Sequence, residues 1–142
     1  MSQRSGLAAQ DLLVAARSGY GWLLASVPRQ MIQGATPRPP GPRAATVARV
    51  LGARHLLQAM ATAWAEAAGL PPVPVLLAGA AVDVTHAASM IGLAVINRPL
   101  RHAALADTVL EAAFGAFGFI AARKLAQAMA STATTASKPA TA

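Results

Sequence analysis

The sequence predicts an all-α fold, a four-helix transmembrane bundle with a disordered C-terminal tail. Hydrophobic residues make up 55% of the 142 residues and charged residues only 12%, against roughly 25% charged residues in average soluble domains. Alanine is abundant and aromatic residues make up 4%, which favours closely packed helices over strands. Several mostly apolar stretches reach the roughly 20 residues that a helix needs to cross a bilayer. The four predicted helices cover residues 7–27, 44–68, 73–96 and 103–124.

The first predicted helix, 7–27, mixes small and large apolar residues and ends at Pro28, which cannot continue helical hydrogen bonding. Asp11 and Arg17 make its insertion into a bilayer marginal, and Tyr20 suits an interfacial level. The sequence therefore leaves open whether this helix crosses the bilayer or lies at its surface, with crossing favoured. The chain lacks the uninterrupted apolar core of a cleavable signal here, so we expect the helix to remain in the mature protein.

Proline and glycine mark the boundaries of the other three helices. Residues 34–42 hold four prolines and read as an extended basic spacer. Gly69 and the prolines after it end the second helix, and Asn97 with a nearby proline ends the third. After the fourth helix comes a low-complexity stretch, 131–142, rich in Ser, Thr and Ala, which we expect to be disordered. Residues 1–130 then form the membrane domain.

Basic residues outnumber acidic ones 12 to 5 and lie mostly between the apolar stretches. Cytoplasmic loops of membrane proteins collect Lys and Arg, so we expect the basic connections before the second helix and after the third to be cytoplasmic. The turn at 69–74, which contains no Lys or Arg, is then external, while Arg123 and Lys124 oppose this topology. The predicted location is the inner (plasma) membrane, crossed several times. The arginines are not clustered on a polar helix with aromatic neighbours, which argues against nucleic-acid binding.

The long apolar stretches carry ionisable residues, which are rare inside membranes and mark functional sites by default. With a rise of 1.5 Å per residue, they fall in one band, roughly 8 to 20 Å from the cytoplasmic helix ends. A lone charge at a helix centre costs about 2.5–3.5 kcal/mol, so we predict pairing, of Arg54 with Asp83 and of Arg17 with Glu111. The predicted intramembrane polar network consists of Arg17, Arg54, His55, Asp83, His86, Asp107 and Glu111.

Three interpretations of this network remain open. It is a structural network that sets which helices pair, or a proton or ion relay with Asp83 and His86 at its core, or a metal site built from the histidines and carboxylates. Two nearby arginines would repel a cation, so we predict no metal and no cofactor. Ser89 lies one turn from His86, but no glycine-framed elbow accompanies it, and no cysteine is present; we predict that the protein is not an enzyme.

One pair of segments resembles a known group of proteins. The segments are Arg49-Val50-Leu51-Gly52-Ala53-Arg54-His55 and, one helix later, Asp83-Val84-Thr85-His86. They resemble small four-helix integral membrane proteins of actinobacteria that have no assigned function, over about residues 16–118. The resemblance implies a four-helix fold and a membrane location, and no particular activity.

We expect the protein to act as a structural or accessory component of a membrane complex. Its partners are then the lipid bilayer and either other membrane subunits or further copies of itself. Small residues, Gly79 on one helix and Gly115 with Gly118 on another, would let such helices approach closely. The alternative function is a small proton- or ion-coupled transporter or channel that uses Asp83 and His86. A soluble alanine-rich bundle is the alternative to the membrane fold.

Overall fold

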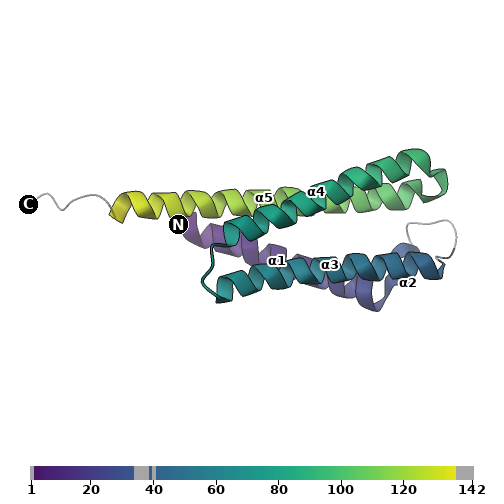
Figure 1. The fold of residues 1–142 in the computed structure, drawn as a ribbon, viewed down its shortest axis with the longest axis horizontal. Coiled ribbons are helices and arrows are strands. Elements are labelled where there is room, and N and C mark those ends of the chain that lie inside the picture. The colour runs from purple at the N-terminus through teal and green to yellow at the C-terminus, as the bar shows by residue number, and fades with distance from the viewer. Residues whose placement is uncertain (1, 34–38, 40, 137–142) are drawn as a thin grey trace, which may run out of the picture.

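The chain folds into helices joined by short connections (Figure 1). The computed structural model describes residues 2–33, 39 and 41–136, and these residues contain no strand, which confirms the all-α prediction. The elements are α1 (Ser2–Ser26), α2 (Pro28–Gln33), α3 (Pro42–Ala67), α4 (Pro72–Ile96), the 3₁₀ turn η1 (Arg98–Leu100) and α5 (Arg101–Ala136).

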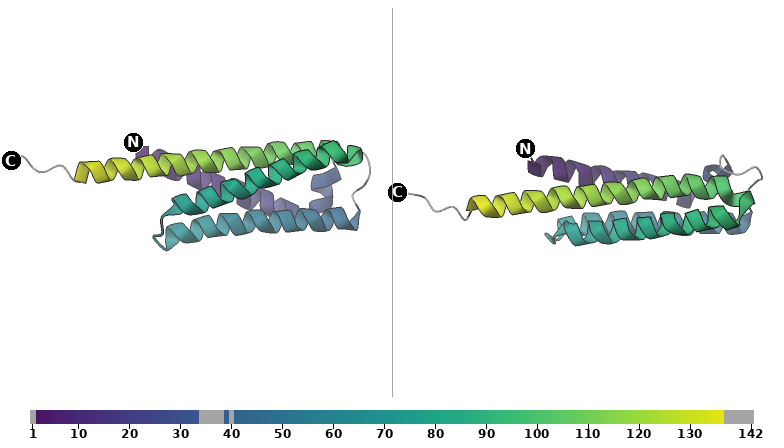
Figure 2. Two further views of the ribbon diagram at one scale, coloured as in Figure 1. Left: turned by 45° about the horizontal axis from the view of Figure 1, so that its top comes forward. Right: turned by 90° about the horizontal axis from the view of Figure 1, so that it is seen from above.

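The four long helices, α1, α3, α4 and α5, run along a common direction and form an elongated bundle (Figures 1 and 2). α4 packs on α5 along much of its length, α1 packs on α3, and α1 also contacts α5. By contrast α3 and α4 contact each other sparsely, although they are consecutive in the chain. The views agree that α2 and the α4–α5 corner lie at one end of the bundle and the α3–α4 turn at the other.

Proline and glycine set the ends of the central helices. Pro42 begins α3 and Pro72 begins α4, where the missing N–H interrupts no bond within the helix. After α3, Gly69 adopts a φ of +66°, which glycine reaches without the steric strain of other residues. The bounds of α3 and α4 lie within two residues of the predicted 44–68 and 73–96.

The N-terminal part of the chain contains one helix more than the sequence predicts. α1 begins at Ser2, before the expected start at residue 7, and ends at Ser26 just ahead of Pro28. Pro28 then opens the short helix α2, because proline is compatible with the first turn of a new helix although it interrupts an existing one. The expected basic spacer, 34–42, lies mostly outside the described residues.

The expected C-terminal boundary is wrong for residues 125–136. α5 continues through Ala136, beyond the predicted end at Lys124 and into the stretch expected to be disordered. Alanine is the strongest helix former, and the polar side chains here bond to their own helix: the hydroxyls of Ser131 and Thr132 donate to carbonyl oxygens four residues earlier. The rest of the expected tail, 137–142, lies outside the described residues.

Close backbone contact joins α1 to α3. A Cβ atom added to Gly21 would lie 2.7 Å from the carbonyl oxygen of Gly52, and one added to Gly52 would lie 2.6 Å from that of Gly21. Separations this short leave no room for a side chain on either residue, so the two helices meet through glycine, as helices in membranes often do. Larger apolar residues form one modest core: Leu13, Leu76, Phe114, Ala121, Ala122 and Leu125.

Buried polar side chains inside the bundle coexist with exposed large apolar side chains on its outside. Six of the eight largest fully buried side chains are polar or charged: Arg17, His55, Gln10, Glu111, Thr62 and Asp83. Large apolar side chains lie on the outside of every long helix. On one face of α3, five of them are 65–67% exposed: Val47, Val50, Leu57, Met60 and Trp64.

Two helical segments are long and apolar enough to cross a membrane. They are Pro72–Ile96 and Arg98–Thr132, each with a mean hydropathy of 1.5 over its most apolar window. Only 28% of each window is buried inside the molecule, whereas the core helix of a soluble protein is mostly buried. Within the described part of the chain, α1 and α3 do not meet the same measure, because both carry several charged residues.

Candidate functional site

The polar residues predicted from the sequence lie in the middle of the bundle and come from all four long helices. α1 supplies Arg17, and α3 supplies Arg54 and His55. The remaining four lie on α4 and α5: Asp83, His86, Asp107 and Glu111. They form three bonded groups, which we call the Arg17–Asp83 pair, the Glu111 cluster (Arg54, His55 and Glu111) and the His86–Asp107 pair.

The Arg17–Asp83 pair joins α1 to α4. Nη2 of Arg17 donates to Oδ2 of Asp83, and both side chains are fully buried, with 1% and 0% of their surface exposed. The other carboxylate oxygen, Oδ1, accepts a hydrogen bond of 3.1 Å from Nε2 of Gln58 on α3. Gln58 also donates to the carbonyl oxygen of Gly79, at 3.2 Å. Both oxygens of Asp83 are therefore satisfied, as a buried carboxylate requires.

Glycine makes room for the Arg17 guanidinium. A Cβ atom on Gly79 would lie 2.9 Å from Nη1 of Arg17, and one on Gly118 would lie 3.7 Å from Nη2. The guanidinium also lies 5.9 Å from the ring centroid of Phe114, within the range of a cation–π contact. Gly79 on α4 thus makes room for the buried cation, whereas position 118 on α5 lies at ordinary van der Waals distance from it.

In the Glu111 cluster both carboxylate oxygens are used. Oε2 accepts a hydrogen bond of 2.5 Å from Nη2 of Arg54, and Oε1 lies 2.9 Å from Nε2 of His55. The His55 ring is held between the rings of Tyr20 and Phe114, each with its centroid 5.1 Å away. Because these contacts come from α1, α3 and α5, the cluster fixes three helices together.

A longer contact connects the two groups. Nη2 of Arg54 lies 3.5 Å from Oδ1 of Asp83, so Arg54 lies between the carboxylates of Asp83 and Glu111. Two guanidinium groups face three carboxylates in the whole network, and protonation of one histidine makes the network neutral. The charges are therefore shared over four helices, as expected where a lone charge is costly.

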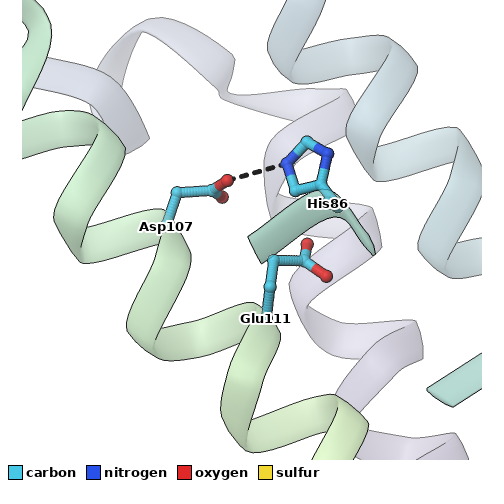
Figure 3. A group of neighbouring side chains, drawn as sticks. All are labelled: His86, Asp107 and Glu111. Atoms are coloured by element: carbon cyan, nitrogen blue, oxygen red, sulfur yellow. Dashed lines mark hydrogen bonds and ion pairs between the residues drawn. The ribbon is translucent and has the colours of Figure 1, made fainter. Parts of the chain in front are cut away.

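The His86–Asp107 pair lies at the more exposed side of the network. Nε2 of His86 is 2.8 Å from Oδ2 of Asp107, and the two side chains are 26% and 18% exposed. Figure 3 shows this bond with Glu111 one turn further along α5. Potential ligand atoms of the three residues lie within 4.8 Å of one another, which raises the question of a metal site.

The surroundings of Glu111 do not suit a metal ion. Its two oxygens already accept bonds from Arg54 and His55, so neither is left to bind a cation at full strength. The Arg54 guanidinium, 2.5 Å from Glu111, would also repel a divalent ion. The chemistry of this donor set favours an ion-pair network over a metal centre.

Of the two predicted ion pairs, that of Arg54 with Asp83 is present at 3.5 Å, but each residue has a shorter contact elsewhere. Arg17 bonds to Asp83 and Arg54 to Glu111, whereas the sequence predicts the reverse assignment. The predicted contact of Arg54 with Asp83 is present as the longer one, and no ion pair between Arg17 and Glu111 occurs among the described residues. Arg17 lies against Gly118, seven residues after Glu111, which is about 10 Å further along α5.

Asp83 and His86, predicted as the core of a possible relay, have different bonding partners. Asp83 and His86 lie three residues apart on α4, but Asp83 bonds to Arg17 whereas His86 bonds to Asp107. The two residues belong to separate groups because α1 reaches Asp83 and the start of α5 reaches His86.

Sequence reasoning missed two glutamines that extend the network. Gln58 lies one helical turn after Arg54, so the same face that carries Arg54 also presents Gln58 to Asp83. Gln10, fully buried on α1, donates to Oε2 of Glu66 at the far end of α3, at 3.1 Å. The signal for Gln58 was its spacing of four residues from Arg54; nothing in the sequence singles out Gln10.

Two neighbouring cavities border the network on the side where α3 and α4 diverge. The first, about 520 Å³, is lined mainly by apolar residues such as Val50, Leu57 and Val75, with Arg54 and Gln58 at its polar edge. The second, about 410 Å³, is lined by Arg54, Ala81, Val82, Thr85, His86 and Ser89. Arg54 and Val82 line both, so the two cavities adjoin, and together we call them the lateral trough.

Comparison with known proteins adds no relative. The chain matches no protein-family model, no curated protein and no solved structure. The resemblance to small actinobacterial membrane proteins therefore stays an expectation from the sequence.

Proposed function

We propose that this protein is a multi-pass integral membrane protein of the inner membrane that acts as a structural or accessory component of a membrane complex. The observation that carries the proposal is a bonded set of charged side chains inside the bundle, Arg17, Asp83 and Glu111 among them, combined with large apolar residues exposed on the outside. In water the opposite holds, since Asp, Glu and Arg are almost never fully buried unless paired. A lipid surround accounts for both halves of the pattern, because it solvates apolar side chains and drives charges into the bundle.

The exposed stripe on α3 supports this reading. Its five large apolar residues recur at spacings of three, four and seven residues, from Val47 to Trp64, and so lie on one helix face. On a soluble monomer, a continuous apolar face of this kind marks an interaction surface. On a membrane protein it faces acyl chains or another subunit.

The proposed role of the polar network is to select one arrangement of the helices. Each charge that inserted unpaired would cost about 2.5–3.5 kcal/mol at a helix centre. The observed packing gives Arg17, Asp83 and Glu111 a partner each. A bundle whose outer surface is equally apolar on several sides needs such an internal device, since lipid does not discriminate between apolar faces.

The charge distribution also favours an orientation. The end of the bundle with α2 and the α4–α5 corner carries five arginines and no carboxylate in its terminal segments: Arg29, Arg43, Arg49, Arg98 and Arg101. The opposite half carries Asp11, Glu66 and the basic residues Arg4, Arg123 and Lys124. Because basic segments stay in the cytoplasm, we assign the α2 end to the cytoplasmic side.

The absence of cysteine makes a direct test of topology possible. We would introduce one cysteine at Gln30, in α2, or at Leu70, in the α3–α4 turn, and label it with a membrane-impermeant maleimide. We expect Leu70→Cys to react in intact spheroplasts and Gln30→Cys to react only in inverted vesicles. Release of the unmodified chain by alkaline carbonate would contradict the membrane proposal, and reversed labelling would contradict the orientation.

A second candidate function is proton or ion transport. It is favoured by one observation, the partly exposed His86–Asp107 pair beside the buried Glu111 cluster. Carboxylates and histidines in sequence across a membrane are the usual carriers of protons. This candidate predicts flux in liposomes that depends on Asp107, whereas the structural role predicts none.

A further inference from the structure

The lateral trough combines two kinds of lining. Towards the α3–α4 turn its walls are aliphatic side chains, among them Leu57, Val75 and Val82. Towards the α4–α5 corner its lining includes Arg54, Thr85, His86 and Ser89. Both volumes, 520 and 410 Å³, fall within the roughly 300–1,000 Å³ of small-molecule sites. The space therefore has the form of a site for a molecule with an apolar tail and a polar head.

Arg54 offers hydrogen-bond donors to this space. Each of its hydrogen bonds and ion pairs runs through Nη2. Nη1 has no partner among the described residues and is not a buried unpartnered atom. Because Arg54 lines both cavities, its N–H groups are available to a molecule bound there. The charge of Arg54 is already balanced by Glu111, at 2.5 Å, and Asp83, at 3.5 Å. A neutral acceptor, such as a carbonyl oxygen, therefore fits better than an anion.

The hydroxyls of Thr85 and Ser89 supply the complementary acceptors. The Thr85 hydroxyl donates to the carbonyl oxygen of Ala81 at 2.8 Å, and the Ser89 hydroxyl donates to that of Thr85 at 2.9 Å. Their hydrogens are thus used within α4, and their lone pairs are left to accept. A head group that matches this lining must accept from Arg54 and donate to Thr85 or Ser89.

We propose that the lateral trough binds a neutral lipid whose head carries both a carbonyl and a hydroxyl group, of the acylglycerol class. The ester carbonyl accepts from Arg54, a free hydroxyl donates to Thr85 or Ser89, and the acyl chain lies between α3 and α4. The inference rests on the proposed membrane location, because lipid reaches the trough from the side, through the gap that the sparse α3–α4 contact leaves.

The test uses the full-length protein in phosphatidylcholine nanodiscs and a monoacylglycerol with a diazirine in its acyl chain. We expect photolabelled peptides to come from α3 and α4, and unmodified monoacylglycerol to compete for labelling while palmitic acid does not. Ala61, which lines the trough, and Ala63, which does not, are both exposed on α3. Ala61→Phe should lower labelling about tenfold, and Ala63→Phe should leave it unchanged.

The polar half is tested by Thr85→Val with Ser89→Ala. Each change removes one acceptor from an exposed position and no contact between helices, so the bundle should fold as before, which circular dichroism checks. We expect an about fivefold weaker competition by monoacylglycerol, in line with the loss of a modest hydrogen bond.

Three outcomes would overturn the inference: equal labelling of Ala61→Phe and Ala63→Phe, competition by palmitic acid but not by monoacylglycerol, or labelling outside α3 and α4. The proposed function fails differently. A chain that carbonate releases from membranes but that still labels at the trough would retain the lipid site and lose the membrane assignment. A chain that stays in the membrane during carbonate extraction but is not labelled would keep the membrane assignment and rule out the lipid site.

Discussion

Arg17 is the residue whose isolation would be most costly, since it is 1% exposed and bonds to Asp83. Asp83→Asn removes the countercharge and leaves the guanidinium in place. Breaking a buried ion pair in this way typically costs about 3–5 kcal/mol, so we expect a markedly lower thermal midpoint in detergent and a lower yield in membranes. Asp11→Asn, at an exposed position of α1, is the matched control and should change neither.

Replacing both partners separates the role of the charges from that of the shape. Arg17→Met with Asp83→Leu fills the same region without charge, and such replacements often recover or exceed the stability of the original pair. We expect the double variant to be more stable than Asp83→Asn alone. An Asp83→Asn protein as stable as the unmodified one would show that the pair does not hold α1 against α4.

The His86–Asp107 pair should behave differently because it is partly exposed. Removal of one partner from such a pair costs about 1 kcal/mol or less, so Asp107→Asn should fold normally. Under the structural function, proton flux in liposomes should be at background both before and after the change. Flux that is present in the unmodified protein and lost in a folded Asp107→Asn variant would establish the transport candidate instead.

At the residue scale the sequence allowed prediction of which side chains occupy the interior, but not of their partners. A fixed rise per residue places Arg54, Asp83 and Glu111 at similar depths whatever the packing. Their pairing depends on the lateral order and offset of the helices, which the sequence does not encode in any local pattern. Arg17 pairs with Asp83 because α1 lies beside Gly79 and Gly118, a contact between segments more than 60 residues apart.

At the scale of the helix, the contact between α1 and α3 can be tested at two glycines of α1, where alanine should change the stability in opposite directions. Gly21 lies against the backbone of Gly52, and Gly19 has nothing within 4 Å of an added Cβ. Gly19→Ala should stabilise the protein slightly, by up to about 1 kcal/mol, because alanine favours the helix. Gly21→Ala should destabilise it by about 1–3 kcal/mol, since α1 and α3 must separate.

Thermal unfolding of the two variants in the same detergent provides the measurement. Both changes add one methyl group to the same helix two residues apart, so helix propensity is matched and only the contact differs. Equal shifts of the midpoint in the two variants would contradict the close approach of α1 and α3.

The helix boundaries show which local signals decide an element and which do not. Prolines, with Gly69, mark the ends of α3 and α4 in the sequence as they do in the structure. The end of α5 carries no such signal. Residues 125–136 combine alanine, which favours a helix, with Ser and Thr, which favour turns unless they bond to the preceding turn, as Ser131 and Thr132 do.

At the scale of the whole molecule, composition was enough to predict an all-helical chain, because abundant alanine and few aromatic residues favour closely packed helices over strands. The arrangement of the helices was not predictable in the same way. The gap between α3 and α4, and with it the lateral trough, arises because α4 pairs with α5 and α1 with α3. Both pairings place small residues at the contact, whereas the α3–α4 face presents larger side chains such as Leu57 and Val82.

The outer surface distinguishes a membrane bundle from a soluble one. Val109, on α5, is 71% exposed and lies within a segment apolar enough to span. On a soluble protein, Val109→Lys would be a surface change worth no more than about 0.5 kcal/mol. Inside a bilayer a lysine at a helix centre costs about 2.5–3.5 kcal/mol. We therefore expect Val109→Lys to reduce the membrane-inserted fraction severalfold, as measured by carbonate extraction and quantitative blotting.

The matched control is Gln127→Lys, at an exposed position of α5 beyond Arg123 and Lys124. That part of the helix already tolerates basic residues, so the variant should insert as the unmodified chain does. If both lysine variants inserted into membranes to the same extent and had the same stability, the exposed apolar residues would not face lipid. A partner protein would then have to cover them. A lower inserted fraction for Val109→Lys alone would indicate that acyl chains surround position 109. An added charge loses contact with water at that position and keeps it at position 127.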